Sequence, residues 1–417
     1  MVRGGVRPGK IGLIGRVDLS GELCDGQTVK TRVMYRLLCE QYGAEHVVVA
    51  DTCGYRSHPL AVTRAVVRCL VRCDDIVVLL SANGRRVLFP LLSAAARHGG
   101  KRVYHNLIGG WLARHLEQHP AWVRHLNAFE VNWVESHALV DALTAQGVAN
   151  AEYLPNFKYF DKAAEAGAGM RAEAGAGMRA EAIACAEVAA RVDGRDGVAG
   201  RTGAVGAAPI DSAAGDVDHA GASGVTGAGA RAEGPVPVRF CTFSRVAACK
   251  GVGDAARAVE RLCVEGLPCT LDVFGPIDPS YRQAFEQALS TCSHVFYRGC
   301  AAPERGAEAI AAYDALLFPT SWKAEGVPGT VVDALAAGVP IIAARWPYHD
   351  EMLVDGVTGL AYPFGHNELL IDAMRRFMKP TTDVGAMRRA CMARAAAYAP
   401  QAVAPRIVAR IGKRGCA

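Results

Sequence analysis

Residues 321–344, SWKAEGVPGTVVDALAAGVPIIAA, are the stretch from which the fold of this chain is best predicted. Gly338 and Pro340 are typical of a helix end, and the apolar run 341–344 after them predicts a buried strand. Glu325 and Asp333 lie eight residues apart, on either side of the turn that opens the helix. The loop before a helix exposes backbone N–H groups and the positive end of the helix dipole, so it can hold an anion. The stretch therefore predicts an anion site flanked by two carboxylates.

A second motif, SRVAACKG at residues 244–251, follows a predicted strand and precedes a predicted helix. Loops in that position project over the carboxyl edge of a parallel sheet, where ligands of open α/β folds bind. Arg245 and Lys250 are the two cations of this loop. The alternative for this segment alone is a solvated basic loop.

Short apolar runs alternate with amphipathic ones along most of the chain, which predicts parallel, doubly wound α/β sheets. The expected strands are 11–15, 46–51, 75–80, 102–106, 131–134, 236–243, 270–274, 295–297, 315–318 and 341–344. The expected helices are 27–42, 59–72, 136–146, 253–265, 282–290, 304–313, the helix that starts near 329, and 402–414.

The composition changes sharply in the middle of the chain. Residues 161–235 are rich in Ala and Gly, and residues 164–171 are repeated word for word as 172–179. A segment with so few large apolar side chains cannot offset the entropy of ordering it, so we expect a flexible insertion. The predicted domains are 1–160 and 236–400, with a C-terminal helix in 401–417 that packs back on the first domain.

Composition and charge indicate which classes of protein this chain can belong to. The fourteen cysteines are scattered, with no Cys-x-x-Cys pair and no predicted metal site, and no apolar run reaches the length of a membrane span. We expect reduced thiols and a cytoplasmic location. Residues 1–160 hold 19 Lys and Arg against 13 Asp and Glu, a net +6. This fits either peripheral contact with an anionic membrane at its inner face or ordinary solvated charge. No nucleic-acid module is visible.

Together the two motifs resemble the Glu-x7-Glu and Gly-Arg-Leu-x-x-x-Lys-Gly signatures of the retaining GT-B-fold glycosyltransferases of group 1 (family 4-like), which include polysaccharide-assembly enzymes. The resemblance covers residues 236–400 well and 10–160 weakly. It implies two Rossmann-like domains facing a cleft, with the donor in the C-terminal domain and the acceptor in the N-terminal one. Asp333 stands where the family has Glu, and Ser244 stands where Gly is common.

The resemblance also implies roles for individual residues. Glu325 would contact the donor sugar, Asp333 the ribose, and Arg245 and Lys250 the diphosphate. The other donor-binding positions in this domain are Ser244, Gly326, Val327, Pro328, Gly329 and Thr330.

The N-terminal domain carries weaker signals. Its glycine-containing loop at 20–31 matches neither the dinucleotide fingerprint nor the P-loop. The resemblance places Gly21 and Gly26 at the donor phosphates, and we expect Lys30 and His105 on the acceptor side. His105 has a second interpretation as a structural histidine. Asp25 is either a ligand or the N-cap of the next helix.

Together, these expectations describe an enzyme that transfers a sugar from a UDP- or GDP-sugar to a glycan or lipid-linked acceptor. The transfer would proceed with retention and without a metal or other cofactor. Capsule, exopolysaccharide or cell-surface glycan synthesis is the expected setting, by analogy. Two alternatives stay open. One is another GT-B enzyme, such as an epimerase or a phosphorylase, and the other is a non-catalytic protein that binds sugar nucleotides.

Overall fold

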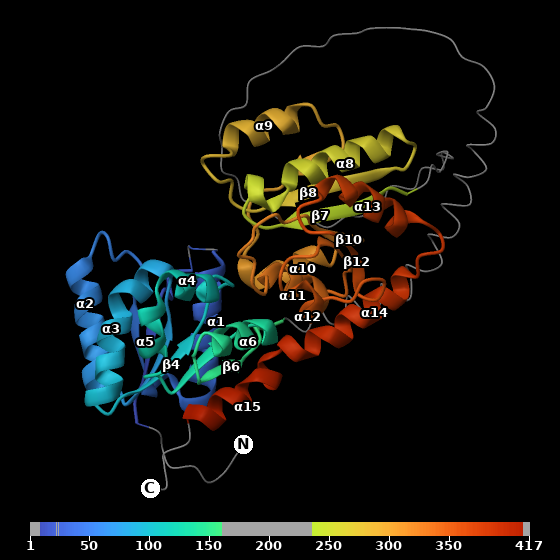
Figure 1. The fold of residues 1–417 in the computed structure, drawn as a ribbon. Coiled ribbons are helices and arrows are strands. Elements are labelled where there is room, and N and C mark those ends of the chain that lie inside the picture. Colours follow the sequence, from blue (N-terminus) through green and yellow to red (C-terminus); the bar gives the residue numbers. More distant parts are fainter. Residues whose placement is uncertain (1–8, 22, 24, 161–235, 412–417) are drawn as a thin grey trace, which may run out of the picture. The chain divides into compact units, whose positions relative to one another are not determined.

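The computed structural model describes residues 9–21, 23, 25–160 and 236–411, and its strands form two six-stranded parallel sheets (Figure 1). Both sheets belong to one compact unit of the chain. The insertion predicted at 161–235 lies outside the described residues. The predicted α/β class, with two Rossmann-like domains, is confirmed.

The first sheet has the order β2-β1-β3-β4-β5-β6, so the strand order reverses at β1. Its strands are β1 Ile11–Gly15, β2 Val47–Asp51, β3 Asp75–Leu79, β4 Arg102–Asn106, β5 Val131–Val134 and β6 Ala151–Tyr153. Its helices are α1 Gly26–Tyr42, α2 Pro59–Arg72, α3 Ala82–His98, α4 Leu112–Gln118, α5 Val123–Leu126 and α6 His137–Ala145.

The second sheet has the order β12-β11-β10-β7-β8-β9, and its strand order reverses between β7 and β10. Its strands are β7 Val238–Phe243, β8 Cys269–Phe274, β9 Val295–Tyr297, β10 Ala315–Phe318, β11 Ile341–Ala344 and β12 Gly359–Tyr362. Its helices are α8 Val252–Val264, α9 Arg282–Ser290, α10 Gly306–Ile310, α11 Gly329–Ala336, α12 His349–Met352, α13 Leu370–Met378 and α14 Val384–Ala395. Ligands of such sheets bind at the point where the order reverses.

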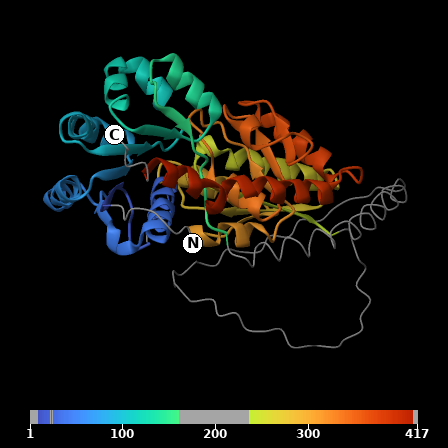
Figure 2. The same ribbon diagram turned by 90° about the horizontal axis from the view of Figure 1, so that it is seen from below.

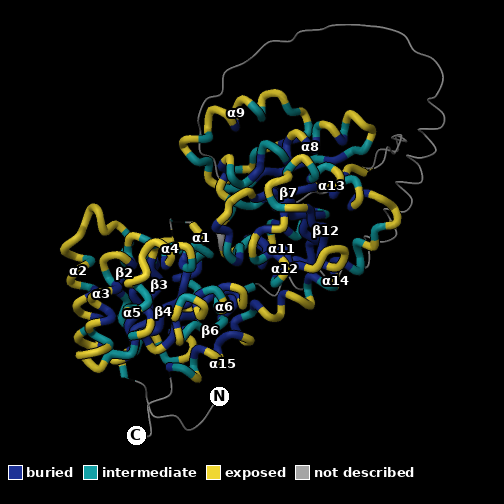
Figure 3. Tube along the Cα trace, viewed as in Figure 1, coloured by how far each residue is buried: buried dark blue, intermediate teal, exposed yellow. Residues whose placement is uncertain are grey.

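The central strands of each sheet are buried, and the outer faces of helices such as α2 and α9 are exposed (Figure 3). All five residues of β1 and of β3 are buried. Helices cover both faces of a parallel sheet, which is why β1 and residues 76–79 of β3 are continuous apolar runs without polar alternation. Apolar clusters lie on the two faces of each sheet.

The last described helix, α15 (Pro400–Ile411), packs on the first sheet although it follows the second in the chain (Figure 1, Figure 2). Val403, Ile407 and Ile411 belong to the same apolar cluster as Ile11 of β1. The guanidinium of Arg102 donates to the carbonyl oxygen of Ile411 at 3.2 Å.

Some elements differ from the sequence prediction. The helix expected at 304–313 begins as a 3₁₀ turn and its α-helical part is only Gly306–Ile310. Helix α3 has no predicted counterpart, and it contains Pro90. Asp25 caps α1, since its carboxylate accepts from the backbone N–H of Thr28 at 3.2 Å. None of the described helices combines the length and the apolar character needed to cross a membrane.

Candidate functional site

The carboxyl ends of β7 and β10 bring the two sequence motifs together. The strands are neighbours in the second sheet, so the loops that follow them lie side by side. Lys250 Nζ lies 2.5 Å from Glu325 Oε2. Two residues that are 75 positions apart in the chain therefore form one ion pair at the point where the strand order reverses.

A glycine allows this close approach. Gly251 has φ +68°, and a Cβ at this position would lie 2.1 Å from the carbonyl oxygen of Pro319, which directly follows β10. The backbone N–H of Ser321 also donates to the carbonyl oxygen of Cys249 at 2.9 Å. The short turn that carries Lys250 is thereby fixed against the loop that carries Glu325.

The Glu325 carboxylate is only partly satisfied. Its Oε2 accepts from Lys250 and from the hydroxyl of Thr320 at 2.8 Å. Among the described residues, Oε1 has no hydrogen-bond donor. Glu325 is 8% exposed, so one carboxylate oxygen is left for a ligand within a largely dehydrated site.

The turn at 326–330 is anchored from several sides. Trp346 Nε1 donates to the carbonyl oxygen of Gly326 at 3.0 Å, and the amide of Asn156 donates to the carbonyl oxygen of Val327 at 2.9 Å. Pro328 is the N-cap of α11, and Gly329 is its first residue. The hydroxyl oxygen of Thr330 is buried and has no hydrogen-bond partner among the described residues.

Asp333 has a different environment from Glu325. Its side chain is buried, and Lys158 Nζ lies 2.6 Å from Oδ2. Burial raises the pKa of the Asp333 carboxyl, and the Lys158 charge opposes that rise. Gly306 abuts the carboxylate, because a Cβ there would lie 2.6 Å from Oδ2. Lys158, which no sequence motif indicates, already neutralises the residue expected to contact ribose.

Arg245 and Ser244 are less enclosed. The Arg245 side chain is 54% exposed, and its guanidinium lies 3.7 Å from Asp278. The hydroxyl of Ser244 donates only to the adjacent carbonyl oxygen of Arg245, at 3.4 Å. Of the two cations in this motif, the structure therefore places Lys250, but not Arg245, against Glu325.

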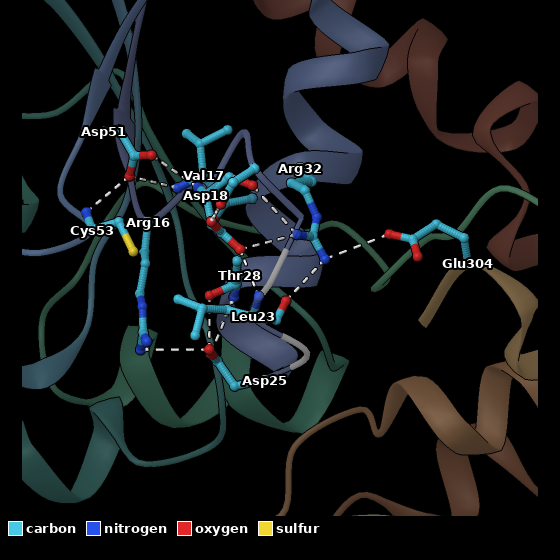
Figure 4. Close-up of polar contacts among 12 residues, drawn as sticks. Arg16, Val17, Asp18, Leu23, Asp25, Thr28, Arg32, Asp51, Cys53 and Glu304 are labelled. Carbon is cyan, nitrogen blue, oxygen red and sulfur yellow. Dashed lines mark hydrogen bonds and ion pairs between the residues drawn. The ribbon is translucent and has the colours of Figure 1, made fainter. Parts of the chain in front are cut away.

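In the first sheet, the loop after β1 is organised around Asp18 (Figure 4). Its carboxylate accepts from the backbone N–H of Leu23 at 2.7 Å, the hydroxyl of Ser20 at 2.5 Å and the guanidinium of Arg32 at 3.3 Å. The Ser20 hydrogen bond, followed by that of Leu23, lowers the pKa of Asp18. Sequence reasoning missed Asp18, although its position in the loop after a buried strand is a usable signal.

Gly21 and Gly26 border this loop. Gly21 has φ +80°, and a Cβ at either glycine would meet nothing within 4 Å. There is space beside both residues. Among the described residues, no contact joins either glycine to Lys250 or Glu325.

Lys30 forms a second lysine–glutamate pair. Its Nζ lies 2.5 Å from Glu135 Oε1 and donates to the carbonyl oxygen of Leu107 at 2.6 Å. Glu135 Oε2 accepts from the backbone N–H of Val327 at 3.2 Å. Glu135, which directly follows β5, thus supports the turn behind Glu325, and sequence reasoning did not identify it.

His105 does not face an acceptor in this structure, because its side chain is fully buried. Its Nδ1 lies 3.1 Å from Asn132 Oδ1. Burial, followed by the charge of Arg85, lowers the pKa of His105 to about 3, so the ring is neutral over the physiological pH range. These surroundings are those of a structural histidine.

Chemically, the loops after β7 and β10 offer a cation, a half-satisfied carboxylate and a turn that opens a helix. A phosphate can take the cation while a hydroxyl takes the carboxylate oxygen. Within the described ranges, no cluster of three or more His, Cys, Asp or Glu side chains could hold a metal ion.

Comparisons with known proteins give a consistent picture of the fold. Residues 237–379 match the family model described as glycosyl transferases group 1. Curated protein sequences give no match.

Several solved structures are similar over nearly the whole chain. Anabaena HepE in complex with UDP has 14% sequence identity and a TM-score of 0.63. A UDP-forming trehalose-phosphate synthase from Burkholderia xenovorans has 12% identity and a TM-score of 0.60, and the lipopolysaccharide outer core galactosyltransferase WaaB has 12% and 0.56. Each alignment covers 97% of this chain and 100% of the other. The chain therefore has the GT-B fold, with two Rossmann-like α/β domains.

Proposed function

We propose that this protein is a glycosyltransferase that moves a sugar from a UDP-sugar to a glycan or lipid-linked acceptor. The observation that carries the proposal is the Lys250–Glu325 pair at the reversal point of the second sheet, with Glu325 Oε1 open to a ligand. The family model over residues 237–379 supports the reaction class. The complexes of HepE with UDP and with UDP-glucose support UDP as the nucleotide.

Each residue then has a part in the reaction. Lys250, assisted by Arg245 from the same loop, neutralises the charge that grows on the leaving diphosphate. Glu325 accepts a hydrogen bond from a hydroxyl of the transferred sugar through Oε1. Gly326, Gly329 and Thr330, in the turn that opens α11, contribute backbone N–H groups, and Thr330 also contributes its hydroxyl. Asp333 contacts the ribose only if it shares its carboxylate with Lys158, since that ion pair is already formed.

We further propose that transfer proceeds with retention and without a bound metal, as the family resemblance implies. The anomeric configuration of the first product, read by proton NMR before mutarotation, tests retention. Activity in EDTA tests independence from a divalent metal. The proposed setting is cell-surface glycan synthesis, and it rests on analogy with the resembling enzymes.

Release of nucleoside diphosphate from a panel of UDP-, GDP- and ADP-sugars, with EDTA present, tests the function directly. We expect release from one UDP-sugar. Lys250→Ala should reduce that rate by about 10²- to 10³-fold, the usual cost of losing one group that stabilises transition-state charge. A rate unchanged in Lys250→Ala would refute the site, and failure of any UDP-sugar to bind in a thermal-shift assay would refute the function.

A further inference from the structure

Two tryptophans meet beside the proposed donor site. Trp111 directly precedes α4, and Trp322 lies in the loop after β10. Their ring centroids are 6.0 Å apart, with the ring planes inclined at 48°. The backbone N–H of Gly110 donates to the carbonyl oxygen of Ala324 at 3.4 Å. The two loops that carry the rings are thus in direct contact.

Trp322 is more open to solvent than the other four tryptophans, of which Trp111 and Trp122 are half-buried. Trp322 is 39% exposed, whereas Trp133 is 1% and Trp346 is 2% exposed. Aromatic side chains bury large areas when they pack in a core, so a pair left partly open to solvent marks a surface that binds something.

Polar donors border the aromatic surface. The guanidinium of Arg114 lies 5.2 Å from the Trp111 ring centroid, and Lys323, next to Trp322 in the chain, is exposed. Among the described residues, neither of these cations has a carboxylate partner, and neither indole N–H has an acceptor. Apolar ring faces and unpaired hydrogen-bond donors therefore lie together.

A pyranose ring matches this combination. It presents a face of C–H groups, which can stack on an indole, and a rim of hydroxyls, which accept hydrogen bonds from Arg114 and Lys323. An acyl chain offers nothing to those donors, so binding it would leave them without partners at a desolvated surface. The chemistry of this surface favours a sugar over a lipid tail.

We propose that Trp111 and Trp322 form an acceptor subsite that binds a hexopyranose ring. The proposal rests on the proposed glycosyltransferase function and names its acceptor class as a glycan, held by its sugar ring. The backbone N–H of Glu325 donates to the carbonyl oxygen of Trp322 at 3.1 Å. Trp322 and the carboxylate proposed to hold the donor sugar thus belong to one turn, which places the acceptor ring next to the sugar to be transferred.

Saturation-transfer NMR on the full chain with UDP, using methyl α-D-glucopyranoside, methyl α-D-galactopyranoside and maltose as probes, tests the subsite. At least one probe should bind, with transfer strongest to the protons of one ring face. Trp322→Ala should weaken that binding by about tenfold or more, by analogy with the stacking of bases on aromatic side chains. Trp322→Phe should retain it within about threefold. Tyr55→Ala is the matched control, because Tyr55 is 48% exposed and lies outside the pair.

UDP affinity is measured by calorimetry on the same samples, so that a failure of the subsite can be distinguished from a failure of the donor site. UDP binding without binding of any probe sugar would overturn the subsite alone. Equal sugar affinity in Trp322→Ala and the unmodified protein would overturn it too, as would binding of the uncharged 1-decanol, in place of any probe sugar, that is lost in Trp322→Ala. Sugar binding that depends on Trp322, in a protein that binds no UDP, would refute the donor assignment and leave the subsite standing.

Discussion

Two lysine–glutamate pairs, one beside each sheet, have the same 2.5 Å separation but opposite surroundings. In Lys30–Glu135 both carboxylate oxygens and the ammonium are bound by protein groups, and the side chains are 4% and 7% exposed. In Lys250–Glu325 the side chains are 14% and 11% exposed, and one carboxylate oxygen has no donor among the described residues. The first pair is saturated and the second has capacity for a ligand. An ion pair therefore indicates a ligand-binding site only when one of its charged groups can still form a hydrogen bond with a ligand.

The largest effect that distinguishes the pairs should be on stability. Lys30→Met leaves Glu135 charged and buried, and breaking a buried pair in this way costs about 3–5 kcal/mol of the free energy of unfolding. Lys250→Met should cost under about 2 kcal/mol, because Oε1 of Glu325, which has no donor among the described residues, is not fully buried and can be hydrated. Urea unfolding followed by tryptophan fluorescence measures both.

The double variant Lys30→Met/Glu135→Leu is the control for this comparison. It removes both charges, so it should recover most of the stability that Lys30→Met loses. Equal losses in Lys30→Met and Lys250→Met would show that the two pairs do not differ in the way proposed.

The next largest effect should be on activity. Glu325→Gln keeps the shape of the side chain but replaces a charged acceptor at the sugar hydroxyl, at a cost of about 1.5–3 kcal/mol, or roughly 10- to 100-fold in rate. UDP affinity, measured by calorimetry, should stay within about threefold, since Lys250 and Arg245, which are proposed to neutralise the diphosphate, are both retained. Glu135→Gln is the matched variant and should lose stability instead. A loss of UDP affinity as large as the loss of rate would mark Glu325 as structural.

The smallest expected effect is the pH dependence of stability that His105 of the first sheet causes. His105 has a folded-state pKa of about 3, against an ordinary value of 6.5. Between those values the unfolded chain binds the proton and the folded protein does not, so His105 makes stability fall as the pH drops from 6.5 towards 3. One such group contributes a slope of at most about 1.4 kcal/mol per pH unit.

His105→Gln removes that titration while keeping a hydrogen-bonding side chain next to Asn132. The difference in unfolding free energy between the variant and the unmodified protein should therefore change with pH below 6.5 and be constant above it. A difference that is constant from pH 7 to pH 4 would contradict the buried, neutral state of His105.

Much of the fold could be predicted because each sheet is buried on both faces. Runs such as 11–15 and 341–344 are apolar throughout, and turn residues separate them from amphipathic helices. Helix α3 was harder to see, since Gly84 and Pro90 interrupt its pattern although both fit within it. The close approach that places Lys250 beside Glu325 depends on Gly251, a residue whose role is visible only in three dimensions.

The partners of the site were not predictable from local sequence. Lys158 and Glu135 meet Asp333 and Val327 across 175 and 192 positions of the chain, and no spacing rule links residues that far apart. Arg245 and Lys250 look equivalent in the motif. The structure separates them by exposure, since Arg245 reaches towards Asp278 while Lys250 is held at Glu325.

The packing of α15 on the first sheet has a consequence for how the protein is made. Ile11 is among the first described residues to leave the ribosome, and Ile407 and Ile411, which share its apolar cluster, are among the last. Nascent domains generally fold as units in order of synthesis. Here part of the core of the first sheet stays uncovered until α15 has emerged, which happens only after the entire second sheet has been synthesised, so the domain made first is completed after the domain made second.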